Sequence, residues 1–409
     1  MSISLHKTGA AACQACLSRS AKLSIHTRQP GMGALLSLPR KALQNLNRPH
    51  SVTASATATR TQSRADPRSK HFWTKDEVPP LDGKVFLVTG SSSGMGWYCA
   101  KTLAENGGHV IMAARSLERT QKAAQMIKDS GARGKVEAMH LDLSSFRSIK
   151  AFSDEIHKRK EPLDVLVNNA GVFLVEHNRT QEGFEVVQGT NYFGTFLLTH
   201  LLLDKLKETS QEKGHARIVT MASLFELLGW IQWDDLEGQK SRESGVFEYS
   251  TSKLELIMMM RHLNKQLKGT GIDCLISQPG LVKTELNGRK LDHRKATAIG
   301  VDLATKVYGQ DAEQASNCLI RPATDPTVEG YGGSYFSPPW LWLLALNFDH
   351  AAMREPGNSL ARDEAAWARL YEKTLDIVNK RLIERGLPTI EAASAAVHGP
   401  SELAVRDGL

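Results

Sequence analysis

A tyrosine and a lysine stand four residues apart, as Tyr249-Ser-Thr-Ser-Lys253, at the start of a long amphipathic stretch. On a helix, residues with this spacing lie on the same face, so the phenol and the ammonium project the same way. An adjacent positive charge stabilises a phenolate and lowers the pKa of tyrosine from about 10. The pair is therefore a candidate general acid or base. The alternative is an interfacial tyrosine beside a lysine whose stem lies on apolar surface, because this spacing is frequent by chance.

A second group of residues has the pattern of a phosphate-binding turn. A run of glycines and serines follows an apolar β-branched run and precedes an amphipathic stretch. Gly90 permits a tight turn, Gly94 lets the backbone approach phosphate, and Gly96 lets helix and strand pack closely. The exposed N–H groups and the dipole of the helix favour an anion there. We expect a dinucleotide-binding turn formed by Gly90, Ser91, Ser92, Ser93, Gly94, Met95 and Gly96.

The end of the next apolar run indicates which dinucleotide would bind. Sites specific for NAD place an Asp or Glu there, and this sequence has Ala114-Arg115-Ser116. The Arg115 guanidinium suits a 2′-phosphate, which favours NADP(H) over NAD(H). A solvated surface charge is the alternative role for Arg115.

Short apolar runs alternate with longer helical stretches from residue 79 onward, which is typical of βαβ units and a parallel sheet. The sequence predicts an α/β fold with a single Rossmann-type doubly wound parallel sheet and helices on both faces. Helices are expected over 184–207 and 249–267, and a further helix is expected to end near Gly386. The predicted strands are 85–88, 110–113, 136–140, 165–167, 217–221 and 273–277.

Several ordered motifs between residues 84 and 380 resemble the short-chain dehydrogenase/reductase family. They are the glycine turn, Asn168-Asn169-Ala170-Gly171, Ser223, Tyr249 with Lys253, and Pro279-Gly280-Leu-Val282-Lys-Thr284. Segments such as Leu141-Asp142-Leu-Ser and Gly189-Thr-Asn191-Tyr-Phe-Gly resemble the retinol dehydrogenase and protochlorophyllide reductase branch of that family.

The resemblance implies roles for individual residues. Tyr249 would donate or accept the proton, Lys253 would bind the nicotinamide ribose and tune Tyr249, and Ser223 would orient the substrate carbonyl. Asn191 would support a water in a proton relay. The remaining cofactor contacts that the resemblance implies are Asp142 and Leu143 near the adenine, Asn169, Ala170 and Gly171 near the ribose, and Pro279, Gly280, Val282 and Thr284 near the nicotinamide; Asn168 is expected to be structural.

The implied function is NADPH-dependent transfer of hydride between nicotinamide and the carbonyl or alcohol of a bulky hydrophobic substrate. One alternative is a light-dependent protochlorophyllide reductase-like enzyme, although Leu281 stands where those enzymes carry a pocket cysteine and their long insertion before the tyrosine is missing. Another is a non-catalytic NADPH-sensing component of a chloroplast envelope complex. The complete Ser223, Tyr249 and Lys253 set favours an enzyme.

Charge is distributed unevenly along the chain. The net charge is +7 overall, but no Asp or Glu occurs before Asp66, and the part after Arg64 has a net charge of −2. The acid-free, hydroxylated composition of residues 1–65 is typical of an organelle transit peptide, with chloroplast favoured and mitochondrion as the alternative. A basic tail that is never removed is a further alternative for these residues. A nearly neutral body gives no electrostatic basis for a nucleic-acid partner.

The expected organisation is a leader over 1–65, a linker over 66–80, one nucleotide-binding domain over 81–385 and a loose tail over 386–409. Cys99, Cys274 and Cys318 read as buried thiols, and no metal site is predicted from the histidine and cysteine spacing.

Tryptophans mark the expected substrate end. Trp230 and Trp233 follow Ser223, and the segment 340–348 contains Trp340 and Trp342 and ends at Phe348. Such apolar walls suit a lipophilic small molecule, and the second segment could contact a membrane interface peripherally. Core packing or an oligomer contact is the alternative.

Overall fold

The computed structural model describes residues 73–176, 178–240, 245–283, 309–338 and 351–398. An eight-stranded sheet forms its centre, in the order β10-β9-β6-β5-β4-β1-β2-β3. All neighbouring strands are parallel except β10, which is antiparallel to β9. The strands are β1 Val85–Thr89, β2 His109–Ala114, β3 Val136–His140, β4 Val165–Asn168, β5 Ala216–Met221, β6 Ile272–Ser277, β9 Tyr335–Ser337 and β10 Ala352–Arg354.

The predicted α/β class and the six predicted strands are confirmed, each within one residue of the observed bounds. Every residue of β1, β4, β5 and β6 is buried, because helices cover both faces of the sheet. The strand order reverses between β1 and β4, and ligands of open α/β sheets bind at such a switch point, beyond the carboxyl ends of the strands.

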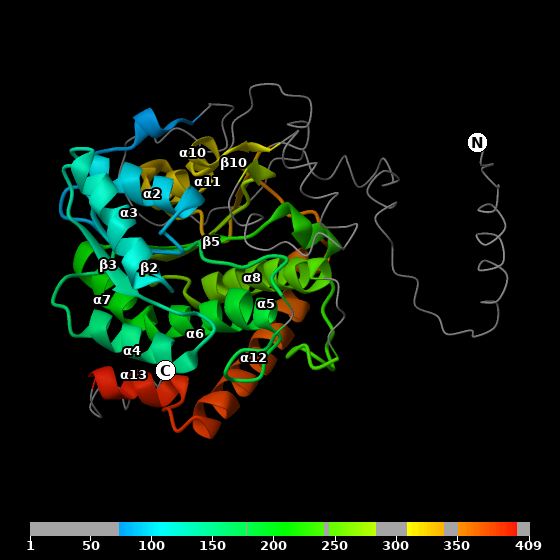
Figure 1. Ribbon diagram of the computed structural model, residues 1–409. Helices are drawn as coiled ribbons and strands as arrows, with labels where there is room; N and C mark the ends of the chain where they lie inside the picture. The colour runs from blue at the N-terminus through cyan, green and yellow to red at the C-terminus, as the bar shows by residue number, and fades with distance from the viewer. Residues whose placement is uncertain (1–72, 177, 241–244, 284–308, 339–350, 399–409) are drawn as a thin grey trace, which may run out of the picture. The chain divides into compact units, whose positions relative to one another are not determined.

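Two helical layers enclose the sheet. One apolar core packs α2 (Gly94–Glu105), α3 (Leu117–Asp129) and α11 (Asn317–Thr324) against one face of the sheet. The other core packs α4 (Phe146–His157), α6 (Gly194–Leu201) and α8 (Val246–Gln266) against the opposite face. Figure 1 shows the two groups on opposite sides of the sheet. The remaining elements are η2 Lys75–Glu77, α5 Val186–Gln188, the π-helix η3 Gly189–Phe193, α7 Leu203–Lys213, η4 Leu224–Leu228, β7 Val282–Lys283, β8 Gln310–Asp311, α10 Ala312–Ala315, η5 Pro326–Val328, η7 Leu360–Arg362, α12 Glu364–Glu384 and α13 Ile390–His398.

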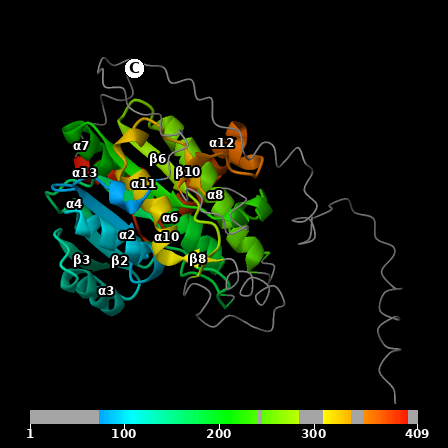
Figure 2. The same cartoon turned by 90° about the horizontal axis from the view of Figure 1, so that it is seen from above.

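The C-terminal part of the chain forms a further layer. Helix α12 begins after Asp363, whose side chain accepts hydrogen bonds from two amides of the first turn. It packs along α8, and Figure 2 shows the two helices side by side from above. Leu370 and Val378 on α12 are fully buried in the core below the sheet.

Two predicted boundaries are wrong. The expected loose tail after residue 386 contains α13, whose Ala393 is buried and which contacts α6. The expected linker up to residue 80 includes Trp73 and Val78, which are buried in the core that contains α2. The predicted leader over 1–65 lies outside the described residues.

Three cysteines of the described chain, Cys99, Cys274 and Cys318, are free and buried, as predicted. Burial raises the pKa of the Cys99 thiol to about 12. Within the described ranges, none of the helices combines the length and the apolar character that a membrane span requires.

Candidate active site

The glycine turn lies between β1 and α2. Gly90 and Gly94 have left-handed backbones, with φ of 65° and 60°. A Cβ on Gly90 would lie 2.7 Å from the Cα atom of Ala170, and one on Gly96 would lie 2.6 Å from the carbonyl oxygen of Gly90. The turn therefore approaches its neighbours more closely than a side chain would allow. Gly94, Met95 and Gly96, the first residues of α2, line the cavity beside it.

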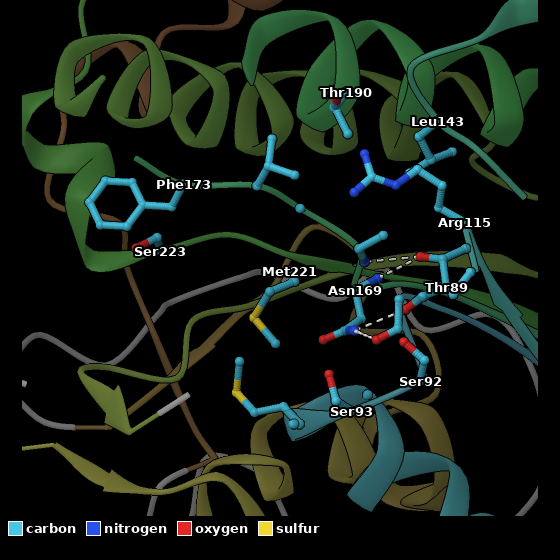
Figure 3. A pocket seen from close by; sticks show the side chains of 18 of the residues that line it. Thr89, Ser92, Ser93, Arg115, Leu143, Asn169, Phe173, Thr190, Met221 and Ser223 are labelled. Atoms are coloured by element: carbon cyan, nitrogen blue, oxygen red, sulfur yellow. Dashed lines mark hydrogen bonds between the residues drawn. The ribbon is translucent and has the colours of Figure 1, made fainter. Parts of the chain in front are cut away.

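Hydrogen bonds join the loop after β4 to this turn. The Thr89 hydroxyl accepts hydrogen bonds from the N–H groups of Asn169 and Ala170, both at 3.0 Å. The Asn169 side chain in turn donates to the carbonyl oxygen of Thr89 at 2.9 Å, as Figure 3 shows. Asn168 points away from this contact and donates to the hydroxyls of Thr199 and Thr220, which supports the structural role expected for it.

Two arginines lie at the far end of β2. Arg115 follows the strand directly, and Arg119 lies one turn further along, in α3. Both line the cavity, and Figure 3 shows Arg115 near Leu143 and Thr190. Arg119 was not predicted, and it lies in the first turn of α3, which begins two residues after Arg115.

The predicted acid–base group lies at the other end of the cavity. Tyr249 and Lys253 are in the first two turns of α8, and Ser223 follows β5. The Ser223 hydroxyl is hydrogen-bonded to Tyr249, and Nζ of Lys253 lies 5.6 Å from the centre of the tyrosine ring. Nζ also donates to the carbonyl oxygen of Met221 at 2.8 Å. All three polar groups therefore converge on one place.

Burial sets the titration of this group. It lowers the pKa of the Lys253 ammonium to about 7, since desolvation disfavours the charged form. It raises the pKa of Tyr249, and the hydrogen bond from Ser223 opposes that rise. A lysine and a tyrosine whose pKa values both depart from the ordinary ones, in one cavity, are typical of acid–base sites.

Asn191 lies at the centre of the π-helix η3, behind this group. Its side-chain oxygen accepts a hydrogen bond from the N–H of Val172 at 2.7 Å, and its amide donates to the carbonyl oxygen of Val172 at 3.0 Å. The amide also donates to Ser252 at 3.2 Å. The Asn191 side chain therefore fixes the loop after Gly171 and, unlike the other predicted catalytic residues, does not line the cavity.

The two ends belong to one cavity of about 460 Å³. Ser91 is also absent from its lining, because its side chain is buried and donates to the carbonyl oxygen of Val88. Thr284 lies outside the described residues. The predicted residues that do line the cavity are Gly90, Ser92, Ser93, Gly94, Met95, Gly96, Arg115, Asp142, Leu143, Asn169, Ala170, Gly171, Ser223, Tyr249, Lys253, Pro279, Gly280 and Val282.

The apolar wall of the cavity differs from the predicted one. Trp230 is 63% exposed, and the Trp233 ring lies under the Arg369 guanidinium at 4.2 Å. Neither tryptophan lines the cavity, and Trp340, Trp342 and Phe348 lie outside the described residues. The apolar residues of the wall are Leu281, which was expected at a pocket position, and five that were not predicted, namely Val172, Phe173, Val175, Met221 and Phe225.

Glu226, three residues after Ser223, connects this wall to the C-terminal part of the chain. Its buried carboxylate accepts hydrogen bonds from the N–H groups of Gly357 and Asn358, at 2.8 and 3.2 Å. The Asn358 side chain donates to the carbonyl oxygens of Glu226 and Gly229. Burial nevertheless raises the pKa of Glu226 to about 7.

This raised pKa predicts a pH-dependent stability. Because the folded protein holds the Glu226 proton more tightly than the unfolded chain, the stabilisation is present below about pH 4.5 and is lost as the pH rises through about 7. Relative to Glu226→Gln, the free energy of unfolding of the wild type should fall by about 3 kcal/mol across this window. Urea unfolding of both proteins between pH 4.5 and pH 8 measures the difference. Parallel pH curves would contradict the assignment.

Comparisons with known proteins agree with this fold and show relatives of the chain. The family model described as short chain dehydrogenase matches residues 84–295. Retinol dehydrogenase 13 of Homo sapiens is 39% identical over 206 residues, which are 50% of this chain and 61% of that protein. Its Mus musculus counterpart is 38% identical over 63% of this chain and 76% of its own length. Polyprenol dehydrogenase of Homo sapiens is 35% identical over 63% of this chain and 77% of its own length.

Solved structures resemble the described fold as well. An uncharacterized protein from Mycobacterium paratuberculosis has a TM-score of 0.58 and 27% identity, covering 75% of this chain and 98% of its own. Levodione reductase has a TM-score of 0.52 and 19% identity, covering 65% of this chain and all of its own, and this likeness concerns the fold alone. The family model covers about half of the sequence, a range that includes the glycine turn, Ser223, Tyr249 and Lys253, and the chain belongs to the short chain dehydrogenase family.

Proposed function

We propose that this protein is an NADP(H)-dependent oxidoreductase that transfers hydride between nicotinamide and the carbonyl or alcohol carbon of a bulky hydrophobic substrate. The observation that carries the proposal is the single cavity that joins the glycine turn to Ser223, Tyr249 and Lys253. A dinucleotide pyrophosphate at the N-terminus of α2 would extend its nicotinamide toward Tyr249. Retinol and polyprenol dehydrogenases among the relatives support the class of reaction.

The residues divide the chemistry between them. In the reductive direction Tyr249 donates its proton to the oxygen that becomes the alcohol. Ser223 donates a hydrogen bond to the same oxygen, and the Lys253 ammonium stabilises the negative charge left on the phenol. The cofactor supplies the hydride. In the oxidative direction the phenolate accepts the alcohol proton, so one geometry serves both directions.

The apolar wall supports a lipophilic substrate. Phe173, Val175, Phe225 and Leu281 line the cavity, and the rings of Phe173 and Phe225 contact that of Tyr249. Burying apolar substrate surface against such a wall stabilises the complex by roughly 25 cal/mol per Å² removed from water. The names of the relatives, retinol and polyprenol dehydrogenase, agree with this class of substrate.

The test of the function is oxidation of NADPH by the full-length chain with a panel of aldehydes, including retinal and polyprenal, and oxidation of retinol and polyprenol with NADP⁺. The assays run in darkness and in light, because turnover that needs light would indicate different chemistry. Turnover in darkness supports the proposal. Tight NADPH binding without turnover of any member of the panel would contradict it.

The cofactor preference gives a separate prediction. Arg115→Ala should weaken NADPH binding by about tenfold and leave NADH binding within about twofold, because charge-assisted hydrogen bonds to a 2′-phosphate are lost. Arg119→Ala should have the same sign, since Arg119 lines the same end of the cavity. Titration of cofactor fluorescence measures both constants. Arg133→Ala, at an exposed arginine on the surface, is the control, and an equal loss for the two cofactors would contradict the role of Arg115.

A further inference from the structure

The loop that follows Gly171 contains an unusual backbone. Leu174 has a φ of 47°, and no other non-glycine residue of the described ranges has a positive φ. A Cβ is disfavoured in this left-handed region, and a leucine gains nothing there from the local hydrogen bonds that Asn or Asp can form. Strained backbones of this kind persist only where the surroundings hold them, and they gather at functional sites.

Contacts hold this loop at two points. On one side, the Asn191 side chain pairs with both the N–H and the carbonyl oxygen of Val172. On the other side, the buried Leu174 side chain packs against Gly245, where a Cβ would lie 3.3 Å from Cδ2 of Leu174. Gly245 is the residue that caps the N-terminus of α8. The loop therefore connects the helix that carries Asn191 to the helix that carries Tyr249.

Phe173 lies between these two points and contacts the catalytic tyrosine. The centres of the Phe173 and Tyr249 rings are 4.4 Å apart, at an interplanar angle of 45°. Phe225 completes the group, with ring centres 5.5 Å from Phe173 and 5.8 Å from Tyr249. All three rings line the cavity, and Figure 3 shows Phe173 beside Ser223. Contacts at these distances and angles are favourable for aromatic pairs.

We propose that Phe173 is a positioning residue that fixes the Tyr249 ring for proton transfer, and that the left-handed backbone at Leu174 is retained because it brings Phe173 onto that ring. Without a positive φ at position 174, the backbone would follow a different path and the Phe173 ring would no longer contact the Tyr249 ring. The inference rests on the proposed function, because it concerns the tyrosine that this function uses. Phe173 has no polar group, so its contribution to that function is to position Tyr249.

The first experiment compares Phe173→Leu with Phe146→Leu in the full-length chain. Both replace a buried phenylalanine that contacts another aromatic ring, but Phe146 lies in α4, outside the cavity lining. Phe173→Leu should lower kcat by roughly tenfold to a hundredfold, as expected for a small displacement of a catalytic group. Its Kd for NADPH should stay within about twofold, and the primary isotope effect with 4-deuterated NADPH should rise as hydride and proton transfer become slower. Phe146→Leu should lower Tm and leave both kcat and the isotope effect unchanged.

The second experiment compares Leu174→Gly with Leu174→Ala. Both variants lose the same packing against Gly245, but only glycine relieves the left-handed backbone. In an unstrained position alanine gives the more stable protein, because glycine loses more entropy on folding. Here we expect the reverse order, with the glycine variant melting at the higher temperature. The glycine variant should keep kcat close to that of the wild type, because glycine adopts the same left-handed backbone without strain and Phe173 therefore stays on the Tyr249 ring.

The outcomes separate the inference from the function. Turnover by the wild type with an unchanged kcat and isotope effect in Phe173→Leu would overturn the positioning role and leave the proposed function intact. A higher Tm for Leu174→Ala than for Leu174→Gly would overturn the inference that the backbone at residue 174 is strained. This measurement needs no substrate. Absence of turnover in the wild type would overturn the proposed function and the positioning role together.

Discussion

Replacement of Tyr249 by Phe should lower kcat by about 10³-fold or more and leave the Kd for NADPH within about twofold. The phenol is the group of the cavity that can deliver a proton to the substrate oxygen, and it is hydrogen-bonded to Ser223. The ring that packs against Phe173 and Phe225 is retained, so the shape of the cavity is preserved. Steady-state rates and a binding titration, made on the same preparation, measure the two quantities.

Tyr371→Phe is the matched control for this loss. Tyr371 lies on α12 and is also buried, and its hydroxyl is hydrogen-bonded to His200 at 2.6 Å. Removing that hydroxyl leaves a buried imidazole nitrogen without this partner and should cost about 1–3 kcal/mol of stability. The control should therefore melt earlier and keep its kcat. An unchanged kcat in Tyr249→Phe would contradict the role of Tyr249 as the proton donor.

Lys253→Met should lower kcat by about 10²-fold to 10³-fold. Methionine fills a similar volume, but the positive charge beside the phenolate is lost, and the carbonyl oxygen of Met221 loses its 2.8 Å donor. Because the pKa of the Lys253 ammonium is lowered to about 7, its positive charge is present below that pH and declines above it. In the wild type the rate should therefore contain a component that falls as the pH rises through about 7. That component should be missing from the variant.

Lys205→Met provides the control for Lys253→Met. Lys205 is a buried lysine of α7 whose Nζ donates to the carbonyl oxygen of Arg159 at 3.0 Å. The same chemical change at this distant helix should reduce Tm without changing the pH profile of kcat. A similar loss of kcat in both variants would mean that Lys253 acts only through stability. In the double variant Tyr249→Phe with Lys253→Met, the loss should be no larger than in Tyr249→Phe alone, because the two residues act as a unit.

Local sequence was sufficient for those features that depend on neighbouring residues. The runs at 85–88 and 217–221 are short, contain β-branched residues and alternate with longer helical stretches, and this pattern predicts buried strands of a parallel sheet. Gly90 and Gly94 adopt left-handed backbones in the turn, and that requirement is local in the chain. The spacing of Tyr249 and Lys253 on one helix fixes their common direction.

Short and edge elements were not predictable in this way. Strands β9 and β10 have only three residues each, and they are strands because β6 offers a partner for β9. The local sequence around Trp73 and over α13 gives no sign of burial. Both are buried by contacts with helices that are far away in the chain. The hydrogen-bonding and packing partners of such segments are nonlocal, so propensity carries little information about them.

The sequence by itself determined the class of fold and the glycine turn, because both follow from residue patterns within one or two elements. The candidate acid–base pair was predicted from its spacing together with the family resemblance. Tertiary structure decided which residues share the cavity. The Ser91 side chain is buried and donates a hydrogen bond to the Val88 carbonyl oxygen, and the Asn191 side chain is hydrogen-bonded to the backbone of Val172. The Phe173 ring packs against the Tyr249 ring. Tertiary structure also excluded Trp230 and Trp233 from the cavity wall. The physical reason is that direction and burial of a side chain depend on contacts across the whole fold, whereas spacing along a helix or strand is set by the backbone alone.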